Sequence, residues 1–151
     1  MPAALLFTLA LAGAEPAPPP TGFCTALDAI IAAADEPIPF RSLETPAGYG
    51  TGEWSTQVIP GYRHCWIMII DEARTVTCSR NLAPPELTAN NLALETGACL
   101  GDAPTPSVWD PTVGKMTFDL GRIRIVVEES CDDRCHVGRR VSYIIAARRR
   151  K

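Results

Sequence analysis

Two cysteines and a histidine near the carboxyl end have the spacing that comes closest to a chemical site. Cys131 and Cys135 are separated by three residues, and His136 follows directly. Two thiols and an imidazole this close together can form a disulfide beside a free histidine, hold a metal ion, or attach a haem. The residues between and around them decide which of these chemistries is open to the chain.

Covalent haem attachment uses two cysteines with two residues between them and an adjacent histidine as axial ligand. This chain has one residue too many between Cys131 and Cys135, and strand-forming segments flank the motif. A disulfide that closes a hairpin tip is the better interpretation, and the chain-entropy model assigns it about 2 kcal/mol. The alternative function is a redox carrier, a haem carrier or a small enzyme using Cys131, Cys135 and His136. We expect no cofactor.

The same segment resembles, over six residues, the cysteine-closed loop of periplasmic lysozyme inhibitors of the Ivy type, which reads Cys-Lys-Pro-His-Asp-Cys. In this chain the ring is one residue shorter, and His136 lies outside it. The resemblance implies a rigid, charged tip that enters a site on a partner protein at low entropic cost. The candidate binding residues of this tip are Asp132, Asp133, Arg134 and His136.

The sequence offers little else that could support catalysis or metal binding. The two histidines, His64 and His136, are far apart along the chain, which does not suggest a zinc site. No G-x-S-x-G segment is present to carry a nucleophilic serine. The glycines at 48–52 lack the spacing of a phosphate-binding loop. We therefore expect neither a bound metal ion nor enzymatic activity.

The amino end of the chain predicts export. Residues 1–14 are mostly apolar and end in small residues, with Ala12-Gly13-Ala14 as the cleavage site of a signal peptide. The apolar run is too short to cross a bilayer as a helix, so no transmembrane anchor is expected after cleavage. Six cysteines in a chain of 151 residues suit an oxidising compartment. The expected location is the bacterial periplasm or the medium.

Charge and proline content divide the rest of the chain. A Pro-rich linker is predicted at 15–22, a single domain at 23–147 and a basic tail at 148–151. Residues 1–133 hold all 17 acidic residues, whereas residues 134–151 hold 7 of the 14 basic ones. The tail has no interleaved aromatic residues, so nucleic-acid binding is not expected. The expected partner is another envelope or extracellular protein.

The stretch 62–80 predicts a central β-hairpin, because both of its halves are rich in β-branched and aromatic residues. A turn centred after Asp71 places Cys65 opposite Cys78. Directly opposed residues in an antiparallel pair have Cβ atoms close enough for a disulfide. The sequence therefore predicts a Cys65–Cys78 bridge, with a four-residue loop at 70–73.

Alternation along the hairpin separates two faces. Trp66, Met68 and Ile70 share the face opposite the cysteines, beside Thr75 and Thr77. Either a helix covers this face, or its apolar side chains form an exposed patch that marks a partner site. Trp66 and Met68 are therefore candidate binding residues.

Two helices are predicted, at 23–35 and at 84–100, the first with Cys24 on its apolar face. The second has two apolar lines, one of Leu87, Leu94 and Ala98 and the other of Leu92 and Cys99. Cys24 and Cys99 can form a bridge if both helices lie on the same sheet face. Further strands are predicted at 38–43, 53–59, 116–120, 123–127 and 137–147, with loops at 45–52 and 102–114. The fold class is α+β, a single antiparallel sheet with two helices packed on one face and stapled by disulfides.

These features together suggest what the chain does. It has the composition of a small exported, disulfide-stabilised domain, and no set of residues in it suits catalysis. The best-supported function is that of a binding protein, such as an inhibitor, immunity or accessory protein, acting on another protein.

Overall fold

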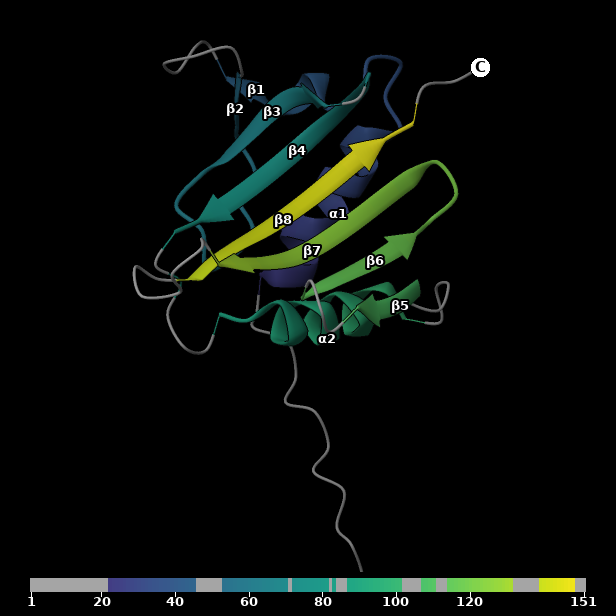
Figure 1. Ribbon diagram of the computed structural model, residues 1–151. Helices are drawn as coiled ribbons and strands as arrows, with labels where there is room; N and C mark the ends of the chain where they lie inside the picture. Colours follow the sequence, from purple (N-terminus) through teal and green to yellow (C-terminus); the bar gives the residue numbers. More distant parts are fainter. Residues whose placement is uncertain are drawn as a thin grey trace, which may run out of the picture.

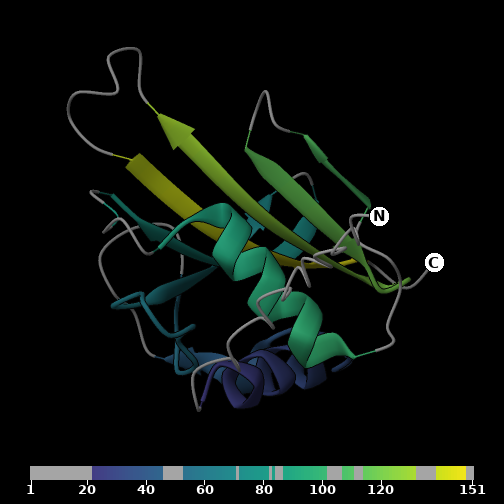
Figure 2. The ribbon, with the colours of Figure 1, turned by 90° about the horizontal axis from the view of Figure 1, so that it is seen from below.

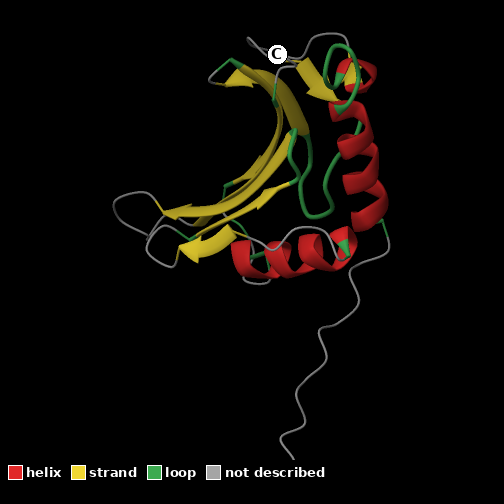
Figure 3. Cartoon of the chain, turned by 90° about the vertical axis from the view of Figure 1, so that its right-hand side faces the viewer, coloured by secondary structure: helices red, strands yellow, loops and turns green. Residues whose placement is uncertain are grey.

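The computed structural model describes residues 22–45, 53–70, 72–81, 83, 87–101, 107–110, 114–131 and 139–148. These residues form an antiparallel sheet of eight strands in the order β1-β2-β3-β4-β8-β7-β6-β5. Helices α1 and α2 lie on the same side of the sheet (Figure 1 and Figure 3). The predicted α+β fold class is confirmed.

The helical elements are α1 (Phe23–Ala34), the short 3-10 helix η1 (Arg41–Leu43) and α2 (Ala89–Leu100). The strands are β1 (Glu44–Thr45), β2 (Glu53–Ser55), β3 (Cys65–Ile70), β4 (Ala73–Arg80), β5 (Ser107–Asp110), β6 (Lys115–Asp119), β7 (Ile123–Cys131) and β8 (Arg139–Ala147). The three longest strands, β4, β8 and β7, lie side by side in the middle of the sheet. Among the described helices, none is long and apolar enough to cross a membrane.

The core lies between the sheet and the two helices. Figure 2 shows both helices on one side of the strands. Alternate residues of the central strands point to this side, and Val141, Tyr143 and Ile145 of β8 are buried there. Phe23 of α1 meets the Tyr143 ring edge to face, with centroids 6.1 Å apart. Burying each such side chain contributes about 2–3 kcal/mol.

A buried hydrogen bond ties α2 to the sheet. The Thr96 hydroxyl donates its only proton to the Leu92 carbonyl at 2.6 Å, so the Tyr143 hydroxyl must donate to Thr96 Oγ1, 2.7 Å away. Burial raises the pKa of the Tyr143 phenol. The Tyr143 phenol therefore keeps its proton at neutral pH and can go on donating to Thr96.

Both disulfides predicted between described cysteines are present. Cys24–Cys99 joins α1 to α2 with Cα atoms 5.2 Å apart, and Cys65–Cys78 joins β3 to β4 with Cα atoms 4.2 Å apart. Each of the four cysteines whose side chains are described is in a disulfide. The two bridges hold different layers, because one links the helices and the other lies within the sheet.

The register of the central hairpin is confirmed, since Cys65 pairs with Cys78 and Ile67 pairs with Val76. The predicted four-residue loop is wrong. Pairing continues to Ile70 and Ala73, so only two residues form the turn. The second of them, Glu72, has φ 63°, the left-handed conformation that two-residue hairpin turns require.

The prediction of a strand at 38–43 is wrong. The chain makes the 3-10 helix η1 there, because Phe40 takes a left-handed conformation with φ 63° and ψ 14°. Its N–H donates to the Ala33 carbonyl at 2.8 Å, and its own carbonyl accepts from the Leu43 N–H at 3.1 Å. Both groups of Phe40 are thereby engaged close to α1, and an extended strand cannot form. Strand β1 follows at Glu44–Thr45. Thr45 is therefore a strand residue, although it falls in the loop predicted at 45–52.

Three other predicted boundaries are corrected. The strand expected at 53–59 is limited to Glu53–Ser55. Helix α2 begins at Ala89, after the Thr88 hydroxyl accepts from the Asn91 N–H at 3.0 Å as an N-cap, and ends at Gly101 as predicted. Strand β5 lies inside the segment expected to be the loop 102–114.

Of the two apolar lines predicted on α2, the line of Leu94 and Ala98 is wrong, whereas Leu92 and Cys99 of the other line do face the rest of the fold. Leu94 is 58% exposed and Ala98 is exposed, whereas Leu92, Ala93 and Thr96 are buried. The helix therefore packs with the face that carries Ala93 and Thr96 toward β6 and β7. The apolar side chains alone did not reveal this face, because Thr96 is polar and is satisfied only by its tertiary contact with the sheet.

One buried group suggests a stabilising substitution. The Tyr62 hydroxyl is buried and has no hydrogen-bond partner among the described residues. Replacing Tyr62 with phenylalanine removes an unpaired polar group, so we expect the free energy of unfolding at pH 7 to rise by about 1 kcal/mol. Urea unfolding of the two proteins measures the difference, and a clear loss of stability would show that the hydroxyl has a partner.

The same substitution has a pH dependence. Burial raises the pKa of Tyr62 above its ordinary value of 10.0, so the folded protein keeps the phenol neutral longer than the unfolded chain does. The wild-type protein should therefore lose stability as the pH rises above about 10, because only the unfolded chain releases the proton there. Tyr62→Phe should lose less over the same range.

Candidate functional site: the open face of the sheet

The face of the sheet opposite the helices is open in the described part of the chain (Figure 1). Trp66 and Met68 lie on it, since their neighbours Cys65 and Ile67 point to the core, as alternation predicted. Both are partly exposed, and no described helix packs over them. Of the two outcomes that the sequence left open, the structure shows an uncovered face.

The candidate residues of the cysteine-closed tip are not placed. Asp132, Asp133, Arg134 and His136, together with Cys135, lie outside the described residues. Cys131 ends strand β7, and its side chain is not described. The third disulfide, the haem alternative and the binding tip therefore stay predictions.

An aromatic cluster of Trp54, His64 and Trp66 occupies one side of the open face. The Trp54 and Trp66 rings lie 5.3 Å apart between centroids, and His64 meets them edge-on at 4.3 Å and 4.5 Å respectively. Strands β2 and β3 bring the two indoles together, because Trp54 pairs directly with Trp66 in the antiparallel register. Each ring holds the others in place, so the cluster is preorganised.

Sequence reasoning missed Trp54 and His64 as members of this site. The alternation of β3 indicated that His64, like Trp66, lies opposite Cys65, but it did not show that a second tryptophan was near. That neighbour depends on the pairing of Trp54 with Trp66, across a connection that makes no regular structure of its own. The three aromatic side chains could have been grouped only if the register between β2 and β3 had been known.

Small hydroxyl side chains fill the middle of the open face. Thr75, Thr77 and Ser142 are buried, with exposed fractions of 2%, 7% and 5%, although no described helix covers them. The Thr75 hydroxyl donates to the Met68 carbonyl at 3.1 Å. The Thr77 hydroxyl, beside Trp66 in the register, has no partner among the described residues.

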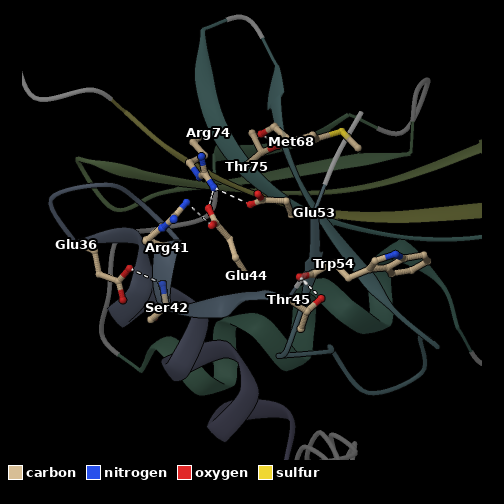
Figure 4. A network of polar contacts seen from close by, with 10 residues as sticks. All are labelled: Glu36, Arg41, Ser42, Glu44, Thr45, Glu53, Trp54, Met68, Arg74 and Thr75. Atoms are coloured by element: carbon tan, nitrogen blue, oxygen red, sulfur yellow. Dashed lines mark hydrogen bonds and ion pairs between the residues drawn. The ribbon is translucent and has the colours of Figure 1, made fainter. Parts of the chain in front are cut away.

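Ion pairs on the helix side hold the strand that carries Trp54 (Figure 4). The Arg74 guanidinium contacts the Glu44 carboxylate closely and the Glu53 carboxylate at 3.3 Å, and Arg41 contacts Glu44 at 2.6 Å. Burial, with Arg41 nearby, lowers the pKa of Arg74. These contacts join η1, β1 and β2 to β4, and so fix the short strand from which Trp54 projects.

The open face shows no metal site among the residues that the structure describes. No group of three or more His, Cys, Asp or Glu side chains there is placed to hold a metal ion. The described face offers a cluster of aromatic rings and a partly exposed methionine. These groups suit the binding of another molecule.

Comparison with known proteins finds no matching family model, no matching curated protein and no matching solved structure. The geometry of the open face is therefore the basis for a functional proposal.

Proposed function

We propose that the chain is a small exported protein of the bacterial periplasm or medium that binds another protein through the open face of its sheet. The observation that carries this proposal is the cluster of Trp54, His64 and Trp66, partly exposed on a face that no described helix covers. Partly exposed apolar side chains gathered on one face are typical of interaction sites, and tryptophan is the residue most enriched among energetic hot spots.

The disulfides and the amino-terminal sequence support the same proposal. The two described disulfides are consistent with an oxidising compartment, and the apolar residues 1–14 have the pattern of an export signal. A rigid sheet that presents prearranged rings loses little entropy when a partner binds. Such a surface suits an inhibitor, an immunity protein or an accessory protein whose target is another envelope or extracellular protein.

Capture experiments with matched variants test this proposal. We expect the immobilised mature chain to retain a partner from the periplasmic or secreted fraction of its own organism, and Trp66→Ala to weaken this binding by about thirtyfold, or about 2 kcal/mol. The control is Leu94→Ala, since Leu94 is 58% exposed on α2, on the helix side. It should leave the affinity unchanged.

Two results would reject the open face as the binding site. One is equal retention of the partner by the wild-type chain and Trp66→Ala, with equal urea midpoints. The other is an equal loss in Leu94→Ala. A third variant, Cys131→Ser with Cys135→Ser, examines the predicted tip separately, and unchanged capture by it would remove the tip from the binding surface.

A further inference from the structure

A pocket of about 360 Å³ lies at one end of the molecule, away from the aromatic cluster. Separate segments line it: the loop after α1, the tip of the β3–β4 hairpin, the β6–β7 turn and the end of β8. Its volume falls in the range of pockets that bind small molecules. None of the open-face residues named above lines this pocket.

The apolar part of this pocket is unusually exposed. Ile38 is 54% exposed and Ile69 is 69% exposed, and they are two of the four large hydrophobic side chains that are exposed in the described part of the chain. Ile69 points to the same side as Cys65 and Ile67, which are buried, but it lies beyond them toward the hairpin tip. Pro37 and Pro39 add further apolar surface.

Arginines from different elements stand at the edge of this apolar surface. The Arg122 guanidinium contacts Asp35 at 3.0 Å, and the Arg148 guanidinium contacts Asp119 at 2.6 Å. Each of these contacts uses one terminal nitrogen, whereas a guanidinium carries five N–H donors. The carboxylates therefore hold the two arginines in position and leave further donors for a ligand.

The third arginine and the acidic residues of the pocket have different roles. Arg74 is held by Glu44 and Glu53, but its buried Nε has no partner among the described residues. Of the two acids that line the pocket, Glu36 accepts from the Ser42 N–H at 3.0 Å, and Glu72 lies exposed in the turn. Glu36 is thus engaged within its own loop, and Glu72 is one carboxylate against the three arginines that line the pocket.

We propose that this pocket binds a small organic acid, in which a carboxylate is attached to an apolar body. The carboxylate lies among the guanidiniums of Arg74, Arg122 and Arg148, whose planar N–H groups match its two oxygens. The apolar body covers Ile38 and Ile69 and removes them from water. A purely apolar ligand would leave the arginines unused, and a small anion would leave Ile38 and Ile69 exposed. A carboxylate with an apolar body contacts both parts of the pocket.

Calorimetric titration with three probes of equal chain length tests the proposal. We expect sodium octanoate to bind, and the neutral octanol and the cationic octylammonium to bind at least about tenfold more weakly, because only the carboxylate meets the arginines. Replacing Arg122 and Arg148 with glutamine should lower the octanoate affinity by about tenfold or more. Ile69→Asn, at a position that is 69% exposed, should also weaken it.

The matched control is the double variant Arg124→Gln with Arg140→Gln. It removes the same charge, and Arg124 also faces Asp119, at 3.8 Å, but neither arginine lines the pocket. Its octanoate affinity should equal that of the wild type. The proposal is overturned if octylammonium binds as tightly as octanoate, if the control variant loses as much affinity as the pocket variant, or if octanoate does not bind. Binding of an apolar peptide without binding of octanoate would likewise reject a small-molecule ligand.

Discussion

Replacing Cys24 and Cys99 with alanine is expected to lower the free energy of unfolding by about 4.5 kcal/mol in the chain-entropy model. The reason is the length of the loop that the bridge closes, since the two cysteines are 75 residues apart. Without the bridge the unfolded chain gains the freedom to separate its ends, and α1 and α2 keep only their packing contacts. Urea unfolding of the oxidised proteins measures the change.

The control for this prediction is the second disulfide. Cys65 and Cys78 are 13 residues apart, so the same model assigns their loop about 3 kcal/mol. Replacing this pair with alanine also leaves small voids, because both cysteines are buried in the core. A loss below about 1 kcal/mol for the Cys24 and Cys99 variant would show that this bridge does not constrain the unfolded chain.

Phe40→Ala is expected to lower the free energy of unfolding by about 4 kcal/mol, whereas Phe40→Gly should cost about 1 kcal/mol less. The Phe40 side chain is fully buried, so both variants lose the same ring. They differ in the backbone, because φ 63° is strained for alanine and ordinary for glycine. Thermal or urea unfolding of both variants gives the order.

Phe118 supplies the matched comparison. It is 1% exposed and lies in strand β6, where the backbone is extended and glycine is the poorer residue. Phe118→Gly should therefore be less stable than Phe118→Ala, which is the reverse of the order at Phe40. The same order at both positions would mean that the left-handed conformation of Phe40 stores no strain.

Several parts of the fold follow from local pattern. The hairpin register was predictable because a turn centred between Asp71 and Glu72 places Cys65 opposite Cys78, whichever loop length closes it. The strands that carry Phe118 and Tyr143 were recognised from alternation. In each of these cases the information lies within about ten residues of the chain.

The predictions failed where a residue depends on a distant partner. Strand β5 exists because it pairs with β6, and its own proline-rich surroundings indicated a loop. Phe40 departs from the extended conformation because its N–H and carbonyl bind groups in α1 and η1. Leu94 is exposed because α2 docks through Thr96, whose hydroxyl is satisfied by Tyr143.

The candidate site divides in the same way. The sequence by itself determined that Trp66 and Met68 face away from the core and that Cys65 lies opposite Cys78, since both follow from alternation. The Cys24–Cys99 bridge was predicted only on the condition that both helices lie on one face of the sheet, and the tertiary structure met that condition. Only the tertiary structure decided that Trp54 and His64 join Trp66, and that Arg74, Arg122 and Arg148 surround one pocket. These residues come from strands and loops that meet only when the whole sheet has formed. No local spacing in the chain therefore encodes the distances between their side chains.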